Sequence, residues 1–252
     1  MVALRRSLAG PLDTLILVGV AALAWAAVAR LVGPQVLTGP TDTLTYLVRL
    51  LADPDFQASA WETARAFFLA LVIAWSSGLV VGMLLGAHRM TGEVAEPILT
   101  ALYSIPKITL YPVVLLFFGL GLSARVAFGA IHGFVPVALF TMAAVRGVRP
   151  IYFRAAQSMR LGPLETAWHI IVPASLPGIV SGLRVGFSLT LLGTLIGEMF
   201  ASQRGLGHLT IKAMETADTR LLIALAFLLV VVATAAGALL LAIDRWVRRR
   251  IP

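Results

Sequence analysis

The side chains of this sequence that could act in catalysis or bind a metal are few and widely separated. The chain contains no cysteine, which excludes thiolate metal ligands and disulfide bonds. No Gly-x-x-x-x-Gly-Lys-Ser/Thr phosphate loop occurs, and no nucleophile is spaced from a base as in a hydrolase. The four histidines lack the spacing of metal ligands: His88, His132, His169 and His208. We therefore expect no enzyme activity, no nucleotide hydrolysis by this chain alone, and no bound metal or cofactor.

A lysine between two prolines interrupts one long apolar run. Lys107 lies between Pro106 and Pro112. A charge near the middle of a bilayer costs roughly 2.5–3.5 kcal/mol on insertion scales, so it normally faces a cavity or a partner. Unwound backbone at that depth is tolerated only where it lines protein or water. These three residues are candidates for a solute pathway, with Lys107 attracting an anion; the alternative is a lysine that extends to the membrane interface.

Two further charges, Arg184 and Glu198, lie near the two ends of a later apolar run and are also pathway candidates. Glu198 can pair with a basic group or form part of an outer gate, or it can cap a helix end in contact with water. The segment that follows it contains a tight glycine turn, Gly205-Leu206-Gly207.

A polar segment from Arg146 to Pro177 separates two apolar runs and is too polar to span a bilayer. Pro150 can open a short helix, which Gly162 can close in the left-handed conformation that glycine tolerates. Pro163 is then suited to the first turn of a second helix, with Glu165 near its positive end. We predict two short helices lying across one end of a membrane bundle.

The second of these helices is predicted to expose an apolar face. Leu164, Trp168 and Ile171 recur at i, i+4 and i+7 and so fall on one side of a helix. Such a face indicates either a docking surface or an ordinary loop with a basic flank.

The composition predicts a membrane protein. Hydrophobic residues make up 59% of the chain and charged residues only 13%, with a mean hydropathy of +0.93. A soluble domain averages roughly 25% charged residues. The formal net charge is +8, but the arginines flank apolar runs instead of forming one face. That distribution is typical of membrane orientation and argues against nucleic-acid binding.

Six apolar runs approach the ~20 residues that a helix needs to cross the hydrocarbon core. They are about Thr14–Val32, Ala64–Ala87, Ile98–Leu120, Val126–Val145, Gly178–Phe200 and Leu221–Ile243. The first follows Arg5 and Arg6 and contains the small residues Ala27 and Ala29, as a signal peptide would, but its apolar run is longer than a usual signal core. We therefore predict an all-α polytopic membrane bundle of about six transmembrane helices, with the first one retained.

The basic residues predict the orientation of the bundle. With a cytoplasmic N-terminus, the inner loops hold eleven Lys and Arg residues and the outer loops hold six, Arg125 among them. Positive charge accumulates on the cytoplasmic side of membrane proteins. Both termini and the polar segment are therefore predicted to be cytoplasmic.

Small residues at strict four-residue spacing predict helix packing faces. One row is Gly78, Gly82 and Gly86, and the other includes Gly178, Gly182 and Gly186. Without Cβ atoms, such rows let helix backbones approach closely where hydrophobic burial no longer drives association.

The polar segment resembles the "EAA" loop of ABC-transporter permeases over Arg154–Leu183, and best at Ile170-Ile171-Val172-Pro173, Leu176-Pro177 and Gly182-Leu183-Arg184. In that family the loop is a coupling helix that binds in a cleft of the ATPase subunit. The motif's glutamate has no counterpart in this sequence. Counting back from Ile170 places Arg154-Ala155-Ala156 at the EAA position and Arg160 where glycine is expected. If Gly162 is instead taken as the motif's glycine, the distance from it to Pro173 is two residues shorter than in the family.

The resemblance implies a set of ATPase-coupling residues: Arg154, Ala155, Ala156, Arg160, Leu161, Gly162, Leu164, Trp168 and Pro173. It extends over nearly the whole chain, and is most similar to the nitrate/sulfonate/taurine branch of importer permeases. The segments that carry it are Glu62-Thr63-Ala64-Arg65, Ser104-Ile105-Pro106, Tyr111-Pro112, Phe117-Phe118-Gly119, Gly197-Glu198-Met199 and Gly205-Leu206-Gly207.

What the resemblance implies is a permease of the type I ABC importer kind, in the bacterial cytoplasmic (inner) membrane. It implies a single permease domain over residues 1–252, with its core at about 60–245 and the coupling loop at 146–177. Expected partners are a second copy of this chain, two ATP-binding subunits that hold the ATP, and an extracytoplasmic solute-binding protein. The expected solute is a small anion such as a sulfonate, taurine or nitrate, or a vitamin precursor. The alternative is an ion-coupled secondary transporter, which usually shows internal inverted repeats; none is evident in this sequence.

Overall fold

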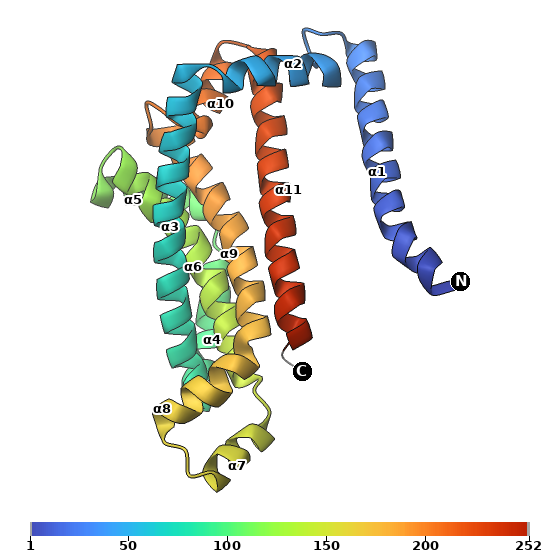
Figure 1. Ribbon diagram of the computed structural model, residues 1–252. Coiled ribbons are helices and arrows are strands. Elements are labelled where there is room, and N and C mark those ends of the chain that lie inside the picture. Colours follow the sequence, from blue (N-terminus) through green and yellow to red (C-terminus); the bar gives the residue numbers. More distant parts are fainter. Residues whose placement is uncertain (1, 251–252) are drawn as a thin grey trace. The chain divides into compact units, whose positions relative to one another are not determined.

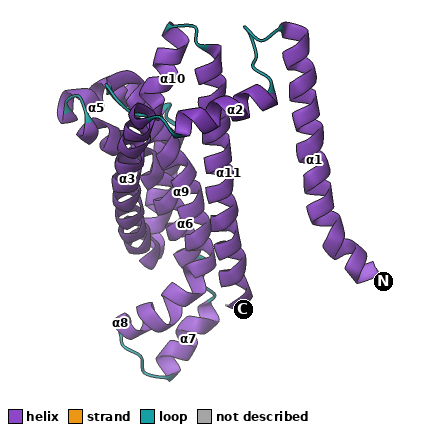
Figure 2. Cartoon of the chain, turned by 45° about the horizontal axis from the view of Figure 1, so that its top comes forward, coloured by secondary structure: helices purple, strands orange, loops and turns teal. Residues whose placement is uncertain are grey.

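Every element of the computed structural model is a helix, within the residues that it describes, 2–250 (Figure 2). Side chains are described for residues 13, 14, 16–200 and 202–246. The predicted all-α fold is confirmed. Several arginines that enter the predicted orientation have side chains outside this range: Arg5, Arg6, Arg248, Arg249 and Arg250.

The helices follow one another along the chain with short connections (Figure 1). They are α1 (Val2–Val32), α2 (Pro40–Leu51), α3 (Pro54–Ala87), α4 (Arg89–Ser104), the 3-10 helix η1 (Lys107–Leu110), α5 (Tyr111–Phe118), α6 (Leu122–Arg146), α7 (Pro150–Ser158), α8 (Pro163–Thr166), the π-helix η2 (Ala167–Ile171), α9 (Val172–Ala201), α10 (Leu206–Glu215) and α11 (Thr219–Arg250).

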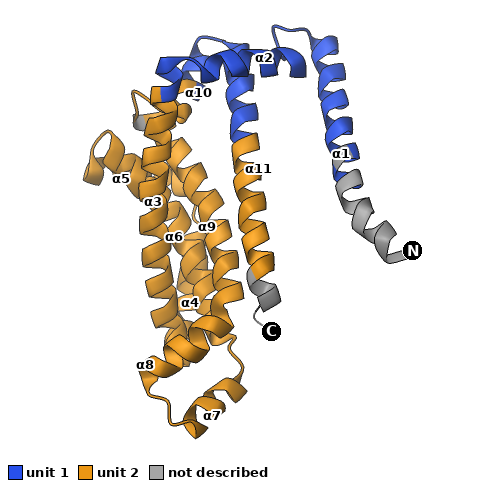
Figure 3. Ribbon diagram, in the orientation of Figure 1, with its two compact units in different colours: residues 1–57, 210–230 blue, residues 58–209, 231–252 orange. Residues whose placement is uncertain are grey.

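Two compact units make up the chain (Figure 3). Unit 1 comprises residues 1–57 and 210–230, and unit 2 comprises residues 58–209 and 231–252. In unit 1, the indole N–H of Trp25 donates to the carbonyl oxygen of Thr38 at 3.0 Å, and its ring lies 5.7 Å from that of Phe227. Unit 2 contains every candidate site residue. The single permease domain expected over the whole chain stays a prediction.

Four helical segments are long and apolar enough to cross a membrane: Pro54–Ala87, Leu122–Arg146, Pro163–Phe200 and Thr219–Trp246. The predicted third span makes a fifth if α4 and η1–α5 are counted together. The predicted first span lies in α1, and Ile16–Val32 is the apolar part of it that falls within the residues with described side chains. The described residues thus hold four or five of the six predicted spans at full length.

The predicted third span bends by 84° at a sharp break. Ile105 is extended, with ψ 132°, and ends α4, because the residue before a proline avoids helical angles. Pro112 lies in the first turn of α5, where proline's missing N–H removes no helical hydrogen bond. Pro106 therefore marks the break, and Pro112 helps to open the helix that follows.

The glycine row of α3 faces α6. A Cβ atom on Gly82 would lie 2.6 Å from the carbonyl oxygen of Ala138, and one on Gly86 would lie 2.9 Å from that of Met142. A Cβ atom on Gly78 would likewise lie 2.7 Å from the Cβ of Val137. These distances leave no room for a side chain, so the two helix backbones touch along the row.

The glycine row of α9 also faces α6, and Figure 1 shows α3, α6 and α9 side by side. A Cβ on Gly178 would lie 2.5 Å from the Cβ of Ala144, and one on Gly182 would lie 2.6 Å from the Cβ of Phe140. Gly186 packs against Val137 in the same row. Helix α6 is therefore the common packing partner of both glycine rows, and it is the most buried of the four spanning segments.

Candidate functional site

The first candidate site is the polar segment, whose first helix ends in a left-handed residue. The N–H of Leu161 donates to the carbonyl of Ala156, and that of Arg160 donates to the carbonyl of Gln157, both at 3.0 Å. Arg160 has a φ of +55°. This is the Schellman pattern of helix C-termini, in which the left-handed position is usually glycine.

The left-handed residue was predicted at Gly162, and that prediction was wrong. Gly162 has φ −68° and ψ 168°, and it precedes α8 as the N-cap residue. Its N–H donates to the carboxylate of Glu165 at 2.8 Å, which places Glu165 in the first turn as predicted. Arg160, which counting back from Ile170 places where the EAA motif has glycine, is thus the residue that adopts the left-handed conformation.

The second short helix also differs from its prediction. Helix α8 does not end before the next span, but runs through the π-helix η2 into α9. A π-helix changes the angular spacing of side chains, so Ile171 does not stay in line with Leu164 and Trp168. Leu164 and Trp168 are 72% and 65% exposed, whereas Ile171 is half-buried. The exposed apolar face is therefore smaller than the spacing predicted.

The other expected coupling residues surround this face. Arg154, Ala155 and Arg160 are exposed, and Ala156, in α7, is buried. Leu161 and Pro173 are half-buried. The segment therefore combines an apolar face with flanking arginines at one end of unit 2.

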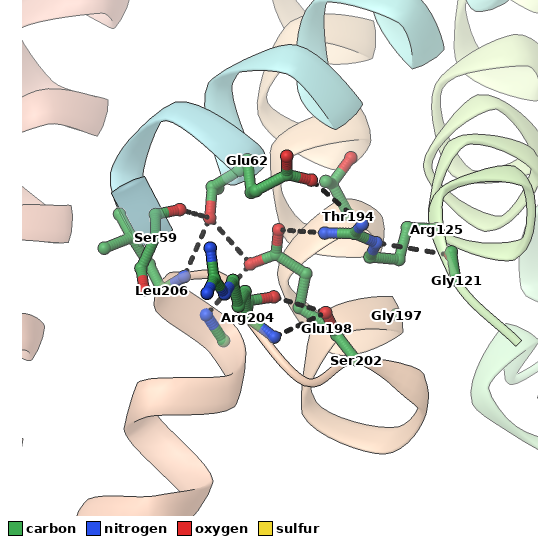
Figure 4. Close-up of polar contacts among 12 residues, drawn as sticks. Ser59, Glu62, Gly121, Arg125, Thr194, Gly197, Glu198, Ser202, Arg204 and Leu206 are labelled. Atoms are coloured by element: carbon green, nitrogen blue, oxygen red, sulfur yellow. Dashed lines mark hydrogen bonds and ion pairs between the residues drawn. The ribbon is translucent and has the colours of Figure 1, made fainter. Parts of the chain in front are cut away.

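The second candidate site is a buried glutamate near the end of α9 (Figure 4). The carboxylate of Glu198 is fully buried, and its Oε2 accepts hydrogen bonds from the Thr63 hydroxyl at 2.8 Å and the Gly207 N–H at 3.0 Å. Its Oε1 pairs with Nη1 of Arg125 at 3.4 Å. Because a buried charge is tolerated only when paired and hydrogen-bonded, these contacts fix the end of α9 against α3 and α6.

The glycine turn after α9 closes around this carboxylate. Gly205 has a φ of +123°, and a Cβ there would lie 2.5 Å from Cδ of Glu198. The N–H of the next residue, Leu206, donates to the Thr63 hydroxyl at 2.7 Å. Glycine is required at position 205 by its backbone angle and by the close approach of the carboxylate.

Arg125 completes the cluster, although the sequence placed it in an outer loop. Helix α6 already begins at Leu122, and Arg125 is buried in its first turn. Its Nε donates to the Gly121 carbonyl at 3.2 Å and its Nη2 pairs with Glu62 at 3.3 Å. Glu198 therefore does pair with a basic group, and the alternative of a cap in contact with water does not hold. Sequence reasoning missed Arg125 and Thr63 as partners of Glu198, and Glu62 as the second partner of Arg125. The available signal was a charged residue at the very start of an apolar run.

The remaining pathway candidates are not gathered into one site. Lys107 lies in η1 at the break, where its Nζ donates to the Tyr103 carbonyl at 3.0 Å and lies 5.1 Å from the ring centroid of Tyr103. Arg184 is half-buried on α9. Among the described residues, no hydrogen bond or ion pair joins Lys107, Arg184 and Glu198 to one another, and no three His, Asp or Glu side chains form a metal site.

Apolar helices long enough to span a membrane and a broken span define a polytopic membrane protein. The chain belongs to the family described as the binding-protein-dependent transport system inner membrane component, which matches residues 78–251. It is thus the transmembrane permease of an ABC importer, located in the inner membrane.

Named relatives are permeases as well. The chain is 28% identical over 200 residues to the taurine transport system permease protein TauC of Escherichia coli (strain K12), a match that covers 77% of this chain and 73% of TauC. It is 29% identical over 197 residues to SsuC of Bacillus subtilis (strain 168), named as a candidate permease for aliphatic sulfonates. This match covers 75% of this chain and 68% of SsuC.

The fold has a match among solved structures. A chain of the MetNI methionine ABC transporter, in an inward-facing conformation, aligns with a TM-score of 0.67 at 21% identity. The alignment covers 79% of this chain and 96% of that one. This likeness confirms the predicted type I importer permease fold.

Proposed function

We propose that this permease imports a small organic anion as a homodimer, with two ATPase subunits that bind the ATP and an extracytoplasmic protein that delivers the solute. In this proposal both termini and the polar segment are cytoplasmic. ATP binding closes the ATPases and draws the two polar segments together, which turns the pathway outward. Two relatives named for taurine and for aliphatic sulfonates support an anionic solute.

The observation that carries the proposal is the exposure of Leu164 and Trp168, which lie in α8 and η2 within the polar segment that leads into α9. Burying such a side chain contributes about 1.5–3 kcal/mol, and interface energy concentrates in a few apolar anchors. A protein partner is therefore the expected cover for this face. The flanking arginines, Arg154 and Arg160, are exposed and hence contribute little, because water and salt screen surface charges.

The test is co-purification of the ATPase subunit of the same transporter with single variants of the tagged permease. Trp168→Ala and Leu164→Asp are expected to reduce the amount of bound ATPase at least tenfold, since about 1.4 kcal/mol corresponds to a factor of ten. Trp61→Ala is the matched control, because Trp61 is 69% exposed in α3, far from the polar segment in the chain. Charge reversal at Arg154 is expected to have a smaller effect than either apolar change.

Two results would contradict the proposal. One is full retention of the ATPase by both apolar variants. The other is solute uptake into vesicles that needs an ion gradient and continues without ATP, which would favour the secondary-transporter class.

A further inference from the structure

A cavity of about 540 Å³ lies beside the buried glutamate cluster, at the ends of α3, α6 and α9. Its charged lining consists of Glu62, Arg125 and Arg204, and its apolar lining includes Leu120 and Phe200. Leu120 and Phe200 are 78% and 58% exposed. Small-molecule sites are commonly concave spaces of ~300–1,000 Å³ with apolar walls and a few converging polar groups. This cavity has those features.

Arg125 has hydrogen-bonding capacity to spare in this cavity. A guanidinium carries five N–H donors, and in the described part of the chain three of those of Arg125 have partners, namely Gly121, Glu62 and Glu198. Its two carboxylate contacts measure 3.3 and 3.4 Å. Charge-assisted hydrogen bonds to carboxylates are usually about 2.7–2.9 Å long. Arg125 thus lines the cavity with a guanidinium that has two N–H donors without a partner among the described residues and two long contacts to carboxylates.

The two carboxylates beside Arg125 are held very differently. Glu198 is fully buried and is also bound by Thr63 and by Gly207. The side chain of Glu62 is 28% exposed, and Arg125 is its side-chain partner among the described residues. An anion that enters the cavity can therefore displace the carboxylate of Glu62 from Arg125, whereas the carboxylate of Glu198 stays fixed by its other hydrogen bonds.

We propose that this cavity receives a small organic anion with a short apolar chain, whose charged head takes the place of the Glu62 carboxylate on Arg125. Arg204, which is exposed at the cavity, adds a second positive charge, and Leu120 and Phe200 line the space for the apolar chain. Arginine suits this role because its planar fork matches the oxygens of a sulfonate or carboxylate. The proposal rests on the proposed function and gives it a reception site and a solute class.

The absence of cysteine makes the cavity directly testable. Gln203 is exposed and lines the cavity, so Gln203→Cys introduces the only thiol of the chain. In nanodiscs, this thiol is expected to react faster with the anionic sulfonatoethyl methanethiosulfonate than with its trimethylammonium counterpart, when each rate is divided by the rate of the same reagent with free 2-mercaptoethanol. Adding Arg204→Gln is expected to lower the ratio of the two rates about twenty-five-fold, because one charge at about 4 Å in water changes each rate about fivefold and in opposite directions. Adding Glu62→Gln is expected to raise it by a similar factor.

Ligand protection provides the second measurement. Butane-1-sulfonate and butanoate are expected to slow the reaction of the Gln203→Cys thiol with neutral N-ethylmaleimide, and the stronger protector identifies the preferred head group. Butyltrimethylammonium is the matched cation and is expected to protect weakly. Each variant is checked for an unchanged elution volume in gel filtration. Arg125 itself is left intact, because removing one partner of a buried ion pair costs about 3–5 kcal/mol.

Equal rates for the two charged reagents after division by their rates with 2-mercaptoethanol, or no more protection by the two anions than by the cation, would overturn the reception site. That result would leave the ATPase complex untouched, so it is distinguishable from a failure of the proposed function. Full retention of the ATPase by Trp168→Ala and Leu164→Asp, with the anion preference of the Gln203→Cys thiol intact, would contradict the coupling face and not this cavity.

Discussion

At the scale of single residues, each candidate site depends on a residue whose conformation or burial is unusual for its type. Arg160 adopts the left-handed conformation that glycine takes in the Schellman motif. Glu198 is charged yet fully buried, because Thr63, Gly207 and Arg125 supply its hydrogen bonds. The conformation of Arg160 is set by backbone hydrogen bonds at the end of α7, and the burial of Glu198 is made possible by partners on other helices.

Arg160→Gly is expected to stabilise the end of α7. A left-handed non-glycine residue costs about 1–2 kcal/mol, and the added freedom of glycine in the unfolded chain returns about 0.4–1 kcal/mol of that gain. The amides of Arg160 and Leu161, which make the two closing hydrogen bonds, should exchange with deuterium several-fold more slowly. Gly162→Ala is the control and should leave them unchanged, because its φ of −68° suits alanine. Faster exchange in Arg160→Gly would contradict the left-handed conformation of Arg160.

At the scale of elements, α3 and α9 each meet α6 through a glycine row, so the bundle depends on close backbone contact. Gly82→Leu is expected to destabilise the protein more than Leu84→Ala in the same helix. A side chain at position 82 would collide with the Ala138 carbonyl and Thr141, whereas Leu84 is 66% exposed.

The measurement for this pair is thermal unfolding in one detergent. Overpacking typically costs about 1–3 kcal/mol, while exposed substitutions usually stay within about 0.5 kcal/mol. Gly82→Leu should therefore unfold at a lower temperature, and Leu84→Ala should unfold like the parent chain. Indistinguishable midpoints would mean that the row does not support the bundle.

Hydropathy predicted the helical class, the two prolines around Lys107 predicted the break, and glycine spacing predicted the small-residue rows, because each is a local pattern. The partners of Glu198 were not predictable in this way. Thr63 and Arg125 are far from it along the chain, and only folding brings α3, α6 and α9 together. Arg125 was assigned to a loop because its charge lowers local hydropathy, although it lies inside α6. The π-helix likewise leaves no clear signal in the sequence.

At the scale of the whole molecule, unit 2 connects the two candidate sites. Helix α9 starts directly after the π-helix of the polar segment and carries Glu198 near its other end. Its contacts with α6 are backbone-close along Gly178, Gly182 and Gly186. Such packing resists gradual deformation, so a displacement of the polar segment is expected to move α9 and α6 together.

Lys107→Ala tests whether the broken span lines the pathway. The lysine lies at the bend between α4 and α5, bonded to the Tyr103 carbonyl. Removing a charge makes membrane insertion easier, so a loss of transport must come from the pathway. We expect uptake of an organic anion by the reconstituted complex to fall at least several-fold, with the amount of bound ATPase unchanged. Lys212→Ala, at the chain's other lysine in α10, is the control and should transport normally. Unaltered uptake by Lys107→Ala would indicate instead a lysine that merely extends to the membrane interface.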